Sequence, residues 1–164
     1  MDFKKIPGYD DYYVNRNGVV LSKKFGKEKI LKPRDDNQGY YIVNLSKNKK
    51  VKTHTVHRLV GLTFIPNPNN YRIIDHIDRN KKNNCVDNLR WCNHQTNNIN
   101  KSKHKTNTSG FKNICFHKRD KTYQVQIIRN EKYITHKFFD TIEEAILHRN
   151  AVLDELSERY DNID

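Results

Sequence analysis

The chain has 164 residues, of which 35% are hydrophobic and 30% are charged, so several small cores are expected rather than one large core. Lysine and arginine total 31 against 19 acidic residues, and the resulting formal charge of +12 favours a polyanionic partner, because each neutralised phosphate releases a condensed counterion. No stretch approaches the roughly 18 apolar residues that cross a bilayer, and the first residues lack the apolar run of a signal peptide, so no membrane association is expected.

The positive charge is concentrated in two stretches. Residues 21–52 carry ten basic and three acidic side chains, and residues 101–137 carry ten basic and two acidic. Residues 138–164 reverse the balance, with two basic and eight acidic side chains. Two basic stretches around a nearly neutral middle are typical of a nucleic-acid-binding surface that surrounds a reaction centre.

Residues 1–52 are predicted to form a basic, β-rich module. An aromatic and β-branched run at residues 12–21 contains Asn17-Gly18, a pair that supplies the positive φ angles of a tight hairpin turn. Residues 39–45 and 50–56 form a second predicted strand pair around a polar turn at 46–49. The pattern indicates small antiparallel sheets.

Residues 53–100 are predicted to form a second module. Apolar positions at helical spacing over 57–65 predict a helix that stops before Pro66. A short apolar strand at 72–77 follows, then a polar loop at 78–84, and then a helix over 92–101 with Asn93 as its N-cap.

Residues 101–108 are polar and basic, and they predict a linker to a third module at 109–164. Strands are expected at 111–116, 123–129 and 133–139. A helix follows, with Thr141 as its cap and a capping box completed by Glu144. Its predicted apolar stripe consists of Ala145, Ile146, Leu147, Val152, Leu153 and Leu156.

Polar residues without an obvious solvation role accumulate at 75–100. Asp75 offers a hard carboxylate for Mg²⁺ or Mn²⁺, and the neighbouring His76 can titrate near neutral pH. Because neighbours on a strand point to opposite faces, the two share a site only if the strand ends there. Zinc is the alternative metal, with Cys85, Cys92 and His94 as ligands, but a fourth ligand at a familiar spacing is missing. The three cysteines form no disulfide framework, which favours a reduced, cytosolic protein.

A set of short motifs with fixed spacing extends over about 45 residues around this segment. It consists of Val56-His57-Arg58-Leu59-Val60, Asp75-His76-Ile77-Asp78, Asn80 through Asn84, Asn88-Leu89-Arg90-Trp91 and Asn97. This set resembles the HNH, or ββα-metal, nucleases, and among them the homing endonucleases of phages and introns, and it is far more specific than an isolated short motif.

The resemblance implies a role for each matched residue. His76 corresponds to the general base that activates water, and Asp75 to the carboxylate metal ligand. Asn88 corresponds to the central asparagine, which holds the loop and orients the histidine ring. Asn97 stands at the last position as the second metal ligand, where many members have histidine, and it suits Mg²⁺ or Mn²⁺ better than zinc. His57 and His94 are further candidates for an assisting role.

The flanking modules carry resemblances of their own. Residues from Ile6-Pro7-Gly8-Tyr9 through Asn17-Gly18 are similar to a module that precedes HNH segments in phage endonucleases. The third module resembles the apetala, or ethylene-response-factor, type of DNA-binding domain. That match rests on Ser109–Lys112, Lys121–Ile128, Phe139-Asp140-Thr141 and Glu143-Glu144-Ala145, with Asn113 where the family usually has glycine. The implied fold class is α+β: a small β-rich N-terminal module, a ββα-metal nuclease centre, and a C-terminal three-stranded antiparallel sheet packed on one helix.

The ethylene-response-factor family lays its sheet in the major groove, where base edges can be distinguished. Tyr123, Val125 and Ile127 should pack on the helix, which turns Gln124 and Gln126 outward as candidate base readers. The residues expected mainly on phosphates are Lys112, His117, Lys118, Arg119 and Lys137.

The resulting hypothesis is a site-specific endonuclease for double-stranded DNA. One catalytic constellation per chain favours nicking by a monomer, with a 5′-phosphate and a 3′-hydroxyl as products. If a phage or intron encodes it, the enzyme acts in the cytoplasm of a bacterial host. Two alternatives stay open at this point: a non-catalytic DNA-binding regulator with a degenerate nuclease centre, and a nuclease for RNA or single strands. The predicted C-terminal DNA-binding sheet argues against a nuclease for RNA or single strands, because the deep groove of A-form RNA is closed to side chains.

Overall fold

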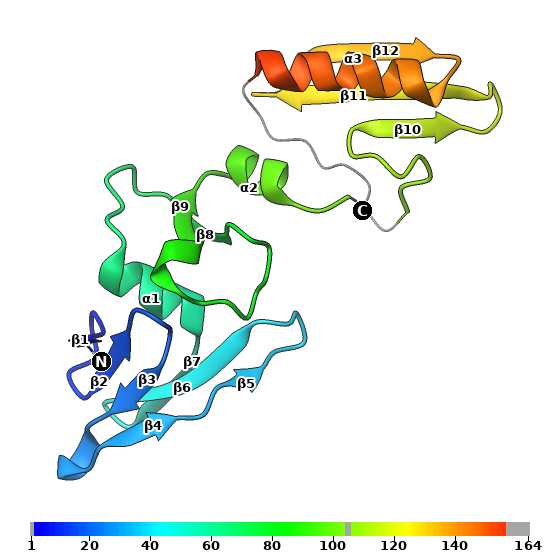
Figure 1. The fold of residues 1–164 in the computed structure, drawn as a ribbon. Helices are drawn as coiled ribbons and strands as arrows, with labels where there is room; N and C mark the ends of the chain where they lie inside the picture. The colour runs from blue at the N-terminus through cyan, green and yellow to red at the C-terminus, as the bar shows by residue number, and fades with distance from the viewer. Residues whose placement is uncertain (1, 104–105, 157–164) are drawn as a thin grey trace. The chain divides into compact units, whose positions relative to one another are not determined.

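The computed structural model describes residues 2–103 and 106–156, so part of the predicted linker and the end of the third module lie outside the described residues. The chain divides into two compact units, residues 1–100 and residues 101–164. Figure 1 shows β-strands and short helices in the first unit, and a sheet covered by one helix in the second. Among the described residues, no helix is both long enough and apolar enough to cross a membrane.

The first sheet of the N-terminal unit has the strand order β1-β2-β3-β4 and is antiparallel throughout. Its strands are β1 (Phe3–Lys5), β2 (Tyr12–Asn15), β3 (Val20–Ser22) and β4 (Lys29–Leu31), and the short helix η1 (Lys24–Gly26) lies between the last two. The predicted turn at Asn17-Gly18 is confirmed: Gly18 has a φ of 81°, and Asn15 Oδ1 accepts hydrogen bonds from the backbone N–H groups of Asn17 and Val19.

The second sheet has the order β5-β6-β7, with β5 at Arg34–Asp35, β6 at Tyr41–Lys47 and β7 at Lys50–Thr55. Helix α1 (Val56–Phe64) follows at once and ends before Pro66, as predicted. Gly61 on this helix lies against strand β8, since an added Cβ would stand 2.3 Å from Ile74 Cδ1. A side chain at position 61 would therefore require the Ile74 side chain to move.

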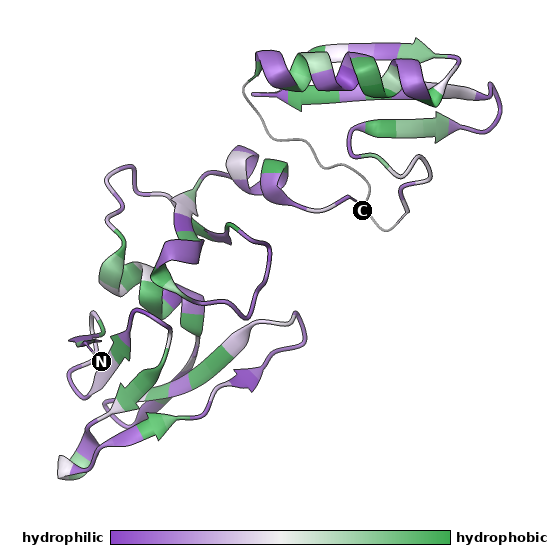
Figure 2. Ribbon diagram, viewed as in Figure 1, coloured by the Kyte–Doolittle hydropathy of each residue, from purple (hydrophilic) through white to green (hydrophobic). Residues whose placement is uncertain are grey.

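One hydrophobic core joins the two predicted N-terminal modules. Ile6, Val14 and Val20 from the first sheet are buried in the same cluster as Leu59 from α1 and Leu89 from the following segment. Apolar residues concentrate on these strands and on α1, whereas the loop after β8 is hydrophilic (Figure 2). The residues around the predicted nuclease centre therefore rest on the N-terminal strands.

The nuclease segment contains a two-stranded antiparallel sheet followed by a helix. Its elements are β8 (Ile73–His76), η2 (Val86–Asn88), β9 (Leu89–Cys92) and α2 (His94–Asn100). Asn93 caps α2 as predicted, because its Oδ1 accepts a hydrogen bond of 2.8 Å from the backbone N–H of Thr96. Two strands and a helix follow the ββα order that the sequence indicates.

The C-terminal unit is a three-stranded antiparallel sheet, β10-β11-β12, with one helix on it. Its elements are β10 (Ile114–His117), β11 (Thr122–Arg129), β12 (Lys132–Phe139) and α3 (Ile142–Glu155). The capping box at Thr141 and Glu144 is present. Ile114, Val125 and Ala145 form the centre of the core between helix and sheet.

Two details of this unit differ from the sequence-based expectation. The first strand begins at Ile114 rather than Phe111, because Asn113 adopts a φ of 65° and turns the chain before pairing starts. Leu147 was expected on the buried stripe of α3 but is 74% exposed. Arg149 is instead fully buried, and its guanidinium lies over the ring of Phe111.

Candidate active site

Asp75 and His76 are the last two residues of β8, and both are buried, with exposed fractions of 8% and 5%. The strand ends at His76, which meets the condition under which strand neighbours can serve one site. Helix α2 packs against β8 and β9 beside them. Two polar side chains are thus held at the edge of a small core.

The carboxylate of Asp75 is held by two donors from other elements. Arg90, its antiparallel partner on β9, donates from Nε at 3.1 Å and from Nη2 at 2.9 Å to Oδ2. Asn100 at the end of α2 donates from Nδ2 to both carboxylate oxygens at 3.0 Å, and to the backbone oxygen of His76 at 2.8 Å. Sequence reasoning gave neither residue a role, although opposite charges at facing strand positions are a readable signal for Arg90.

The ring of His76 is fixed by Asn84, which is buried in the loop after β8. His76 Nε2 lies 3.1 Å from Asn84 Oδ1. Asn84 in turn rests on the N-terminal hairpin, where a Cβ added to Gly18 would come within 2.9 Å of its Cβ. Sequence reasoning placed Asn84 in the matching stretch Asn80 through Asn84 but gave it no role of its own, and its contact with His76 supplies one.

Asn88 holds the loop between β8 and β9. Its Oδ1 accepts from the backbone N–H of Asp78 at 3.0 Å, and its Nδ2 donates to Asp78 Oδ1 and to the backbone oxygen of Asn83, each at 2.8 Å. Burial raises the pKa of Asp78, but hydrogen bonds from Asn83, from the backbone of Asn80 and from Asn88 outweigh it and leave that pKa below its usual value. Asn88 therefore organises the loop, whereas the histidine ring is bonded to Asn84.

His57 on α1 lies next to the same histidine. The ring centroids of His57 and His76 are 5.0 Å apart, and the ring of Tyr40 lies 5.1 Å from that of His57. His57 Nδ1 is buried and has no hydrogen-bond partner among the residues that the structure describes. Burial, together with the nearby His76 and Arg58, lowers the pKa of His57 to about 4, so its ring is neutral at physiological pH.

The residues near Asp75 suit a hard cation. Asp75 supplies carboxylate oxygens, and Asn97 lies three residues before Asn100 on the same face of α2. In the structure it is Asn100, one turn beyond Asn97, that contacts Asp75. Oxygen donors of this kind fit Mg²⁺ or Mn²⁺ and suit zinc poorly.

The alternative zinc ligands do not come together. Within residues 2–103 and 106–156, no group of three or more histidine, cysteine, aspartate or glutamate side chains is placed to hold a metal ion. Cys85 lies near Asn17, with 3.7 Å between Sγ and Oδ1. Cys92 is buried on β9, and burial raises the pKa of its thiol. A thiolate site is therefore not formed by the described residues.

The predicted DNA-contacting residues of the C-terminal unit lie in several places. Val125 and Ile127 are fully buried against α3, which turns Gln124 and Gln126 to the other face of the sheet, as expected. Lys118 and Arg119 are exposed in the turn after β10, and Arg119 pairs with Asp120 at 2.9 Å.

The remaining two lysines are placed differently from each other. Lys137 pairs with Val125 between β12 and β11, so the alternation of the strand assigns it to the face of the sheet that α3 covers. Lys137 is nevertheless exposed. Lys112 donates from Nζ to the backbone oxygen of Lys101 at 2.6 Å.

The outward face of this sheet also carries two residues that sequence reasoning missed, His136 and Phe138. Gln124 accepts at Oε1 from His117, 2.6 Å from its Nε2, and its Nε2 lies against the ring of His136. Phe138 stands next to both histidines, with ring centroids 5.5 Å away. Alternation along β12 places His136 and Phe138 on the same face, which is the signal that could have found them.

Comparison with known protein families identifies two segments. Residues 1–46 match the NUMOD4 motif, and residues 54–99 match an HNH endonuclease family. The second match contains Asp75, His76, Asn88 and Asn97.

Relatives and a solved structure point the same way. The chain is 35% identical to DNA endonuclease I-HmuI of Bacillus phage SP01 over 157 residues, which cover 95% of this chain and 83% of that protein. It is 43% identical over 97 residues to the uncharacterized HNH endonuclease L245 of Acanthamoeba polyphaga mimivirus, and 34% identical over 90 residues to H-N-H endonuclease F-TflII of Escherichia phage T5. These matches cover 59% and 54% of this chain, but only 29% and 46% of the relatives' own lengths.

The structure described as "DNA binding and cleavage by the HNH homing endonuclease I-HmuI" aligns with a TM-score of 0.54 at 28% identity and covers 98% of both chains. HNH nucleases in general use a divalent metal ion. The mixed α and β fold, the family match at residues 54–99 and the near full-length similarity to I-HmuI lead to one conclusion: this chain belongs to the HNH endonuclease family.

Proposed function

We propose that the protein is a site-specific homing-type endonuclease that hydrolyses one phosphodiester bond of double-stranded DNA at a time, using Mg²⁺ or Mn²⁺. The observation that carries this proposal is the pair Asp75 and His76 at the end of β8, each held by a partner from a different element. The proposal includes action as a monomer in the cytoplasm of a bacterial host. The phage origin of I-HmuI and F-TflII supports the bacterial host.

His76 is the proposed general base. Because Asn84 Oδ1 can only accept, the His76 ring donates to it from Nε2, and in its neutral form the ring carries its lone pair on Nδ1. That nitrogen would take a proton from the water molecule that attacks phosphorus, a function that contributes about 10²- to 10⁴-fold to the rate. A hydrogen-bonded ring on a buried strand end holds the lone pair in one direction.

Asp75 and Asn97 are the proposed metal ligands, and Asn88 is the residue that keeps the loop in place beside them. Bound there, a divalent ion would supply positive charge for the leaving 3′-oxygen. Arg90 and Asn100 fix the Asp75 carboxylate through the hydrogen bonds given above. With water attacking phosphorus and the 3′-oxygen leaving, the products are a 5′-phosphate and a 3′-hydroxyl.

The C-terminal unit is proposed to be a DNA reader of the ethylene-response-factor type. Its three-stranded sheet with one covering helix is the support, together with Gln124 and Gln126 on the open face. Glutamine can bond both N6 and N7 of adenine in the major groove. Lys112, His117, Lys118, Arg119 and Lys137 are the proposed phosphate contacts.

A plasmid assay tests the proposal. Supercoiled plasmid carrying the target site is incubated with protein in Mg²⁺, Mn²⁺, Zn²⁺ or EDTA. We expect open circles with Mg²⁺ or Mn²⁺ and none with EDTA, and DNA ligase should reseal them, since ligase needs a 5′-phosphate beside a 3′-hydroxyl. Linear product at the earliest times would exclude nicking, and binding without any cleavage would favour a non-catalytic regulator.

A further inference from the structure

The turn that joins β3 to β4 has an unusual residue at its tip. Phe25 and Gly26 have successive positive φ angles of 56° and 72°, and the Lys27 N–H donates to the Lys24 backbone oxygen at 3.0 Å. Successive positive φ angles are the mark of a type I′ turn, which favours asparagine, aspartate or glycine. A phenylalanine in this conformation is strained.

Two other hairpins of the same chain provide a comparison. Asn48-Lys49 joins β6 to β7 with φ angles of 50° and 61°, and Asn130-Glu131 joins β11 to β12 with 49° and 63°. Both have asparagine at the first position, whose short polar side chain tolerates this conformation. Phe25 thus occupies the turn position that is asparagine in these two other hairpins.

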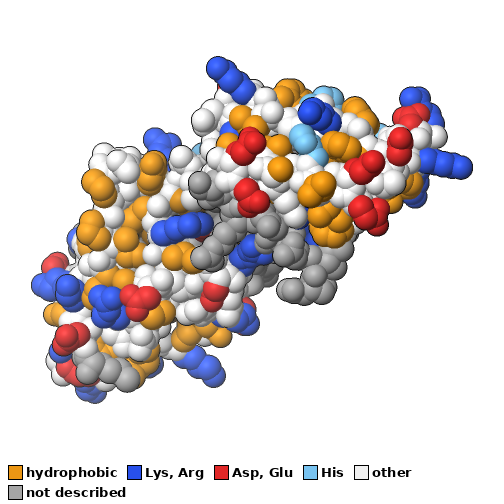
Figure 3. All heavy atoms as spheres, turned by 45° about the horizontal axis from the view of Figure 1, so that its top comes forward, with side chains coloured by type: hydrophobic (Ala, Val, Ile, Leu, Met, Phe, Trp, Pro, Cys, Tyr) orange, Lys and Arg blue, Asp and Glu red, His pale blue; other side chains and the backbone are white. Residues whose placement is uncertain are grey.

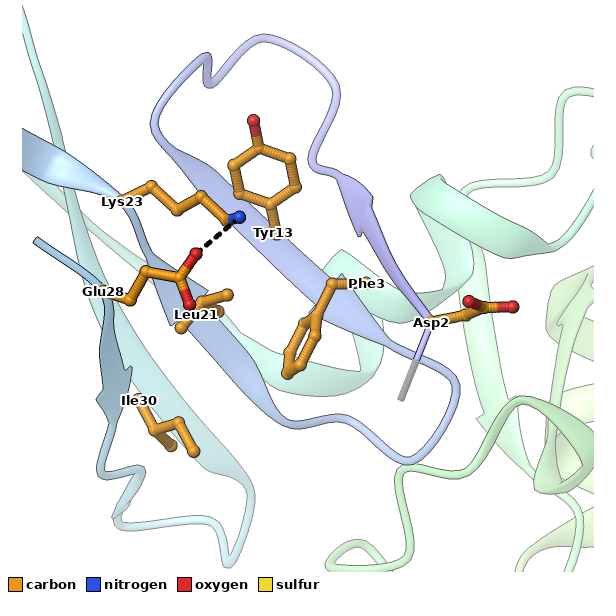
Figure 4. Close-up of a pocket in the computed structure, with 7 residues that line it drawn as sticks. All are labelled: Asp2, Phe3, Tyr13, Leu21, Lys23, Glu28 and Ile30. Atoms are coloured by element: carbon orange, nitrogen blue, oxygen red, sulfur yellow. Dashed lines mark ion pairs between the residues drawn. The ribbon is translucent and has the colours of Figure 1, made fainter. Parts of the chain in front are cut away.

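No packing against the described residues compensates for this strain. The Phe25 side chain is 95% exposed. A hollow with both apolar and charged lining residues lies beside the hairpin, but Phe25 is not among the lining residues, which Figure 4 shows. At the base of the turn, Lys23 Nζ forms an ion pair with Glu28 Oε1 at 2.7 Å, which Figure 4 shows. This pair links the two strands of the hairpin, while the ring of Phe25 at the tip is exposed to solvent. The hollow is lined by Asp2, Phe3, Tyr13, Leu21, Lys23, Glu28 and Ile30.

The charge around the ring indicates the partner. Lys27 and Lys29 are exposed, and neither makes an ion pair with a described residue. They belong to the stretch 21–52, which carries ten basic and three acidic side chains. Lysine and arginine side chains project from the surface in the space-filling view (Figure 3). An exposed aromatic ring among cations matches bases flanked by phosphates.

We propose that Phe25 is a wedge that inserts between neighbouring base pairs of duplex DNA, with Lys27 and Lys29 on the adjacent phosphates. Within the N-terminal unit, the β3–β4 turn lies at the end away from β8, β9 and α2 (Figure 1), so this contact is remote from the cleavage centre. Inserted apolar side chains unstack and kink DNA, most easily at pyrimidine–purine steps. The wedge would therefore add affinity and a preference for deformable sequence. This inference rests on the proposed function, because it takes duplex DNA as the partner.

The test uses a full-length protein and a readout that needs no known target site. A closed circular plasmid is relaxed by a metal-independent type IB topoisomerase in EDTA, with and without protein, and its linking number is measured. We expect wild type and Phe25→Trp to change the linking number, and Phe25→Ala to lose that change. Phe25→Ala should also bind duplex DNA about tenfold more weakly with an unchanged salt dependence, because stacking is lost but no charge.

Matched variants separate this effect from general damage. Val51→Ala removes another exposed apolar side chain of the basic stretch and should leave the linking number and affinity unaltered. Phe25→Gly should raise Tm by relieving strain and still weaken binding as Phe25→Ala does. If Phe25→Ala binds and unwinds DNA like wild type while wild type nicks plasmid in Mg²⁺, the wedge is wrong and the proposed function stands. If wild type neither binds nor nicks DNA, both are wrong.

Discussion

His76 and His57 lie 5.0 Å apart by ring centroids, and their surroundings give them different chemistry. His76 has a hydrogen-bond partner for one ring nitrogen, which leaves the other directed for proton transfer. His57 has a buried nitrogen without a partner in the described part of the chain and a pKa of about 4. This difference supports the proposal that His76, rather than His57, is the general base.

Asn84→Ala should lower kcat by about 10- to 100-fold while leaving DNA affinity within twofold, because the partner that orients His76 is lost and no DNA contact is removed. Single-turnover nicking and gel-shift titration measure the two quantities. Asn83→Ala, which removes a neighbouring loop side chain that bonds Asp78 instead, is the control for loop damage. Equal kcat losses in both variants would mean that loop stability, not ring orientation, is responsible.

The depressed pKa of His57 predicts how stability depends on pH. His57 takes up a proton near pH 6.5 in the unfolded chain but only near pH 4 in the folded chain. The stability that the neutral ring contributes to the folded protein is therefore fully present above pH 6.5 and is lost as the pH falls toward 4. By pH 4 the free energy of unfolding should fall by about 2–3 kcal/mol on this account. His57→Gln should lose that part of the slope in urea titrations at pH 7, 5.5 and 4. An identical slope in the variant would show that His57 is not buried neutral.

At the scale of elements, the N-terminal hairpin supports the loop of the nuclease segment. The Asn17-Gly18 turn lies under Asn84, and Asn84 holds His76. The turn itself was readable from sequence, since asparagine–glycine pairs favour positive φ. Its contact with Asn84 was not, because the two residues are far apart in the chain and local patterns do not encode which loop a turn supports.

Gly18→Ala and Gly8→Ala form a matched pair for this support. Both glycines have φ near +80°, so alanine costs each about 1–2 kcal/mol of backbone strain. A Cβ at Gly18 would clash with Asn84, whereas one at Gly8 meets nothing within 4 Å. Thermal unfolding should show a lower Tm in both variants, whereas nicking assays should show a lower kcat in Gly18→Ala alone. Equal activity in the two would contradict the role of the hairpin.

Short or polar-filled elements were the hardest to predict. Strands β1 and β4 have three residues each, too few for an alternating pattern to stand out. Arg149 on α3 was missed because an amphipathic pattern counts apolar side chains, yet its guanidinium is buried over Phe111. By contrast, β11, the capping box of α3 and the end of β8 were predictable, since alternation, capping chemistry and a terminal polar pair are local signals.

For the whole molecule, chemistry and much of the DNA affinity are expected to reside in different units. Asp75, His76, Asn88 and Asn97 all lie within residues 1–100, and that unit has its own core. The division of this unit into modules at 1–52 and 53–100 stays a prediction, and their shared core could not be seen from sequence because it depends on long-range packing.

Deleting residues 105–164 should retain nicking but weaken binding and loosen site choice. The deletion removes most of a stretch with ten basic and two acidic side chains. Each lost phosphate contact should flatten the slope of log K against log salt by about 0.9. Loss of Gln124 and Gln126 should reduce base discrimination by roughly 1–3 kcal/mol each. A truncated protein with unchanged affinity and salt slope would exclude a DNA-reading function for the C-terminal unit.

The most direct test of the proposed mechanism compares cleavage and binding in His76→Ala. Nicking of target plasmid in Mg²⁺ and gel-shift affinity in EDTA are measured for the variant and for wild type. Because His76 is proposed to act on water rather than to hold the duplex, cleavage should fall by at least about 10²-fold while Kd stays within about twofold. Undiminished cleavage, or a loss of binding that matches the loss of cleavage, would contradict the assignment of His76 as the general base.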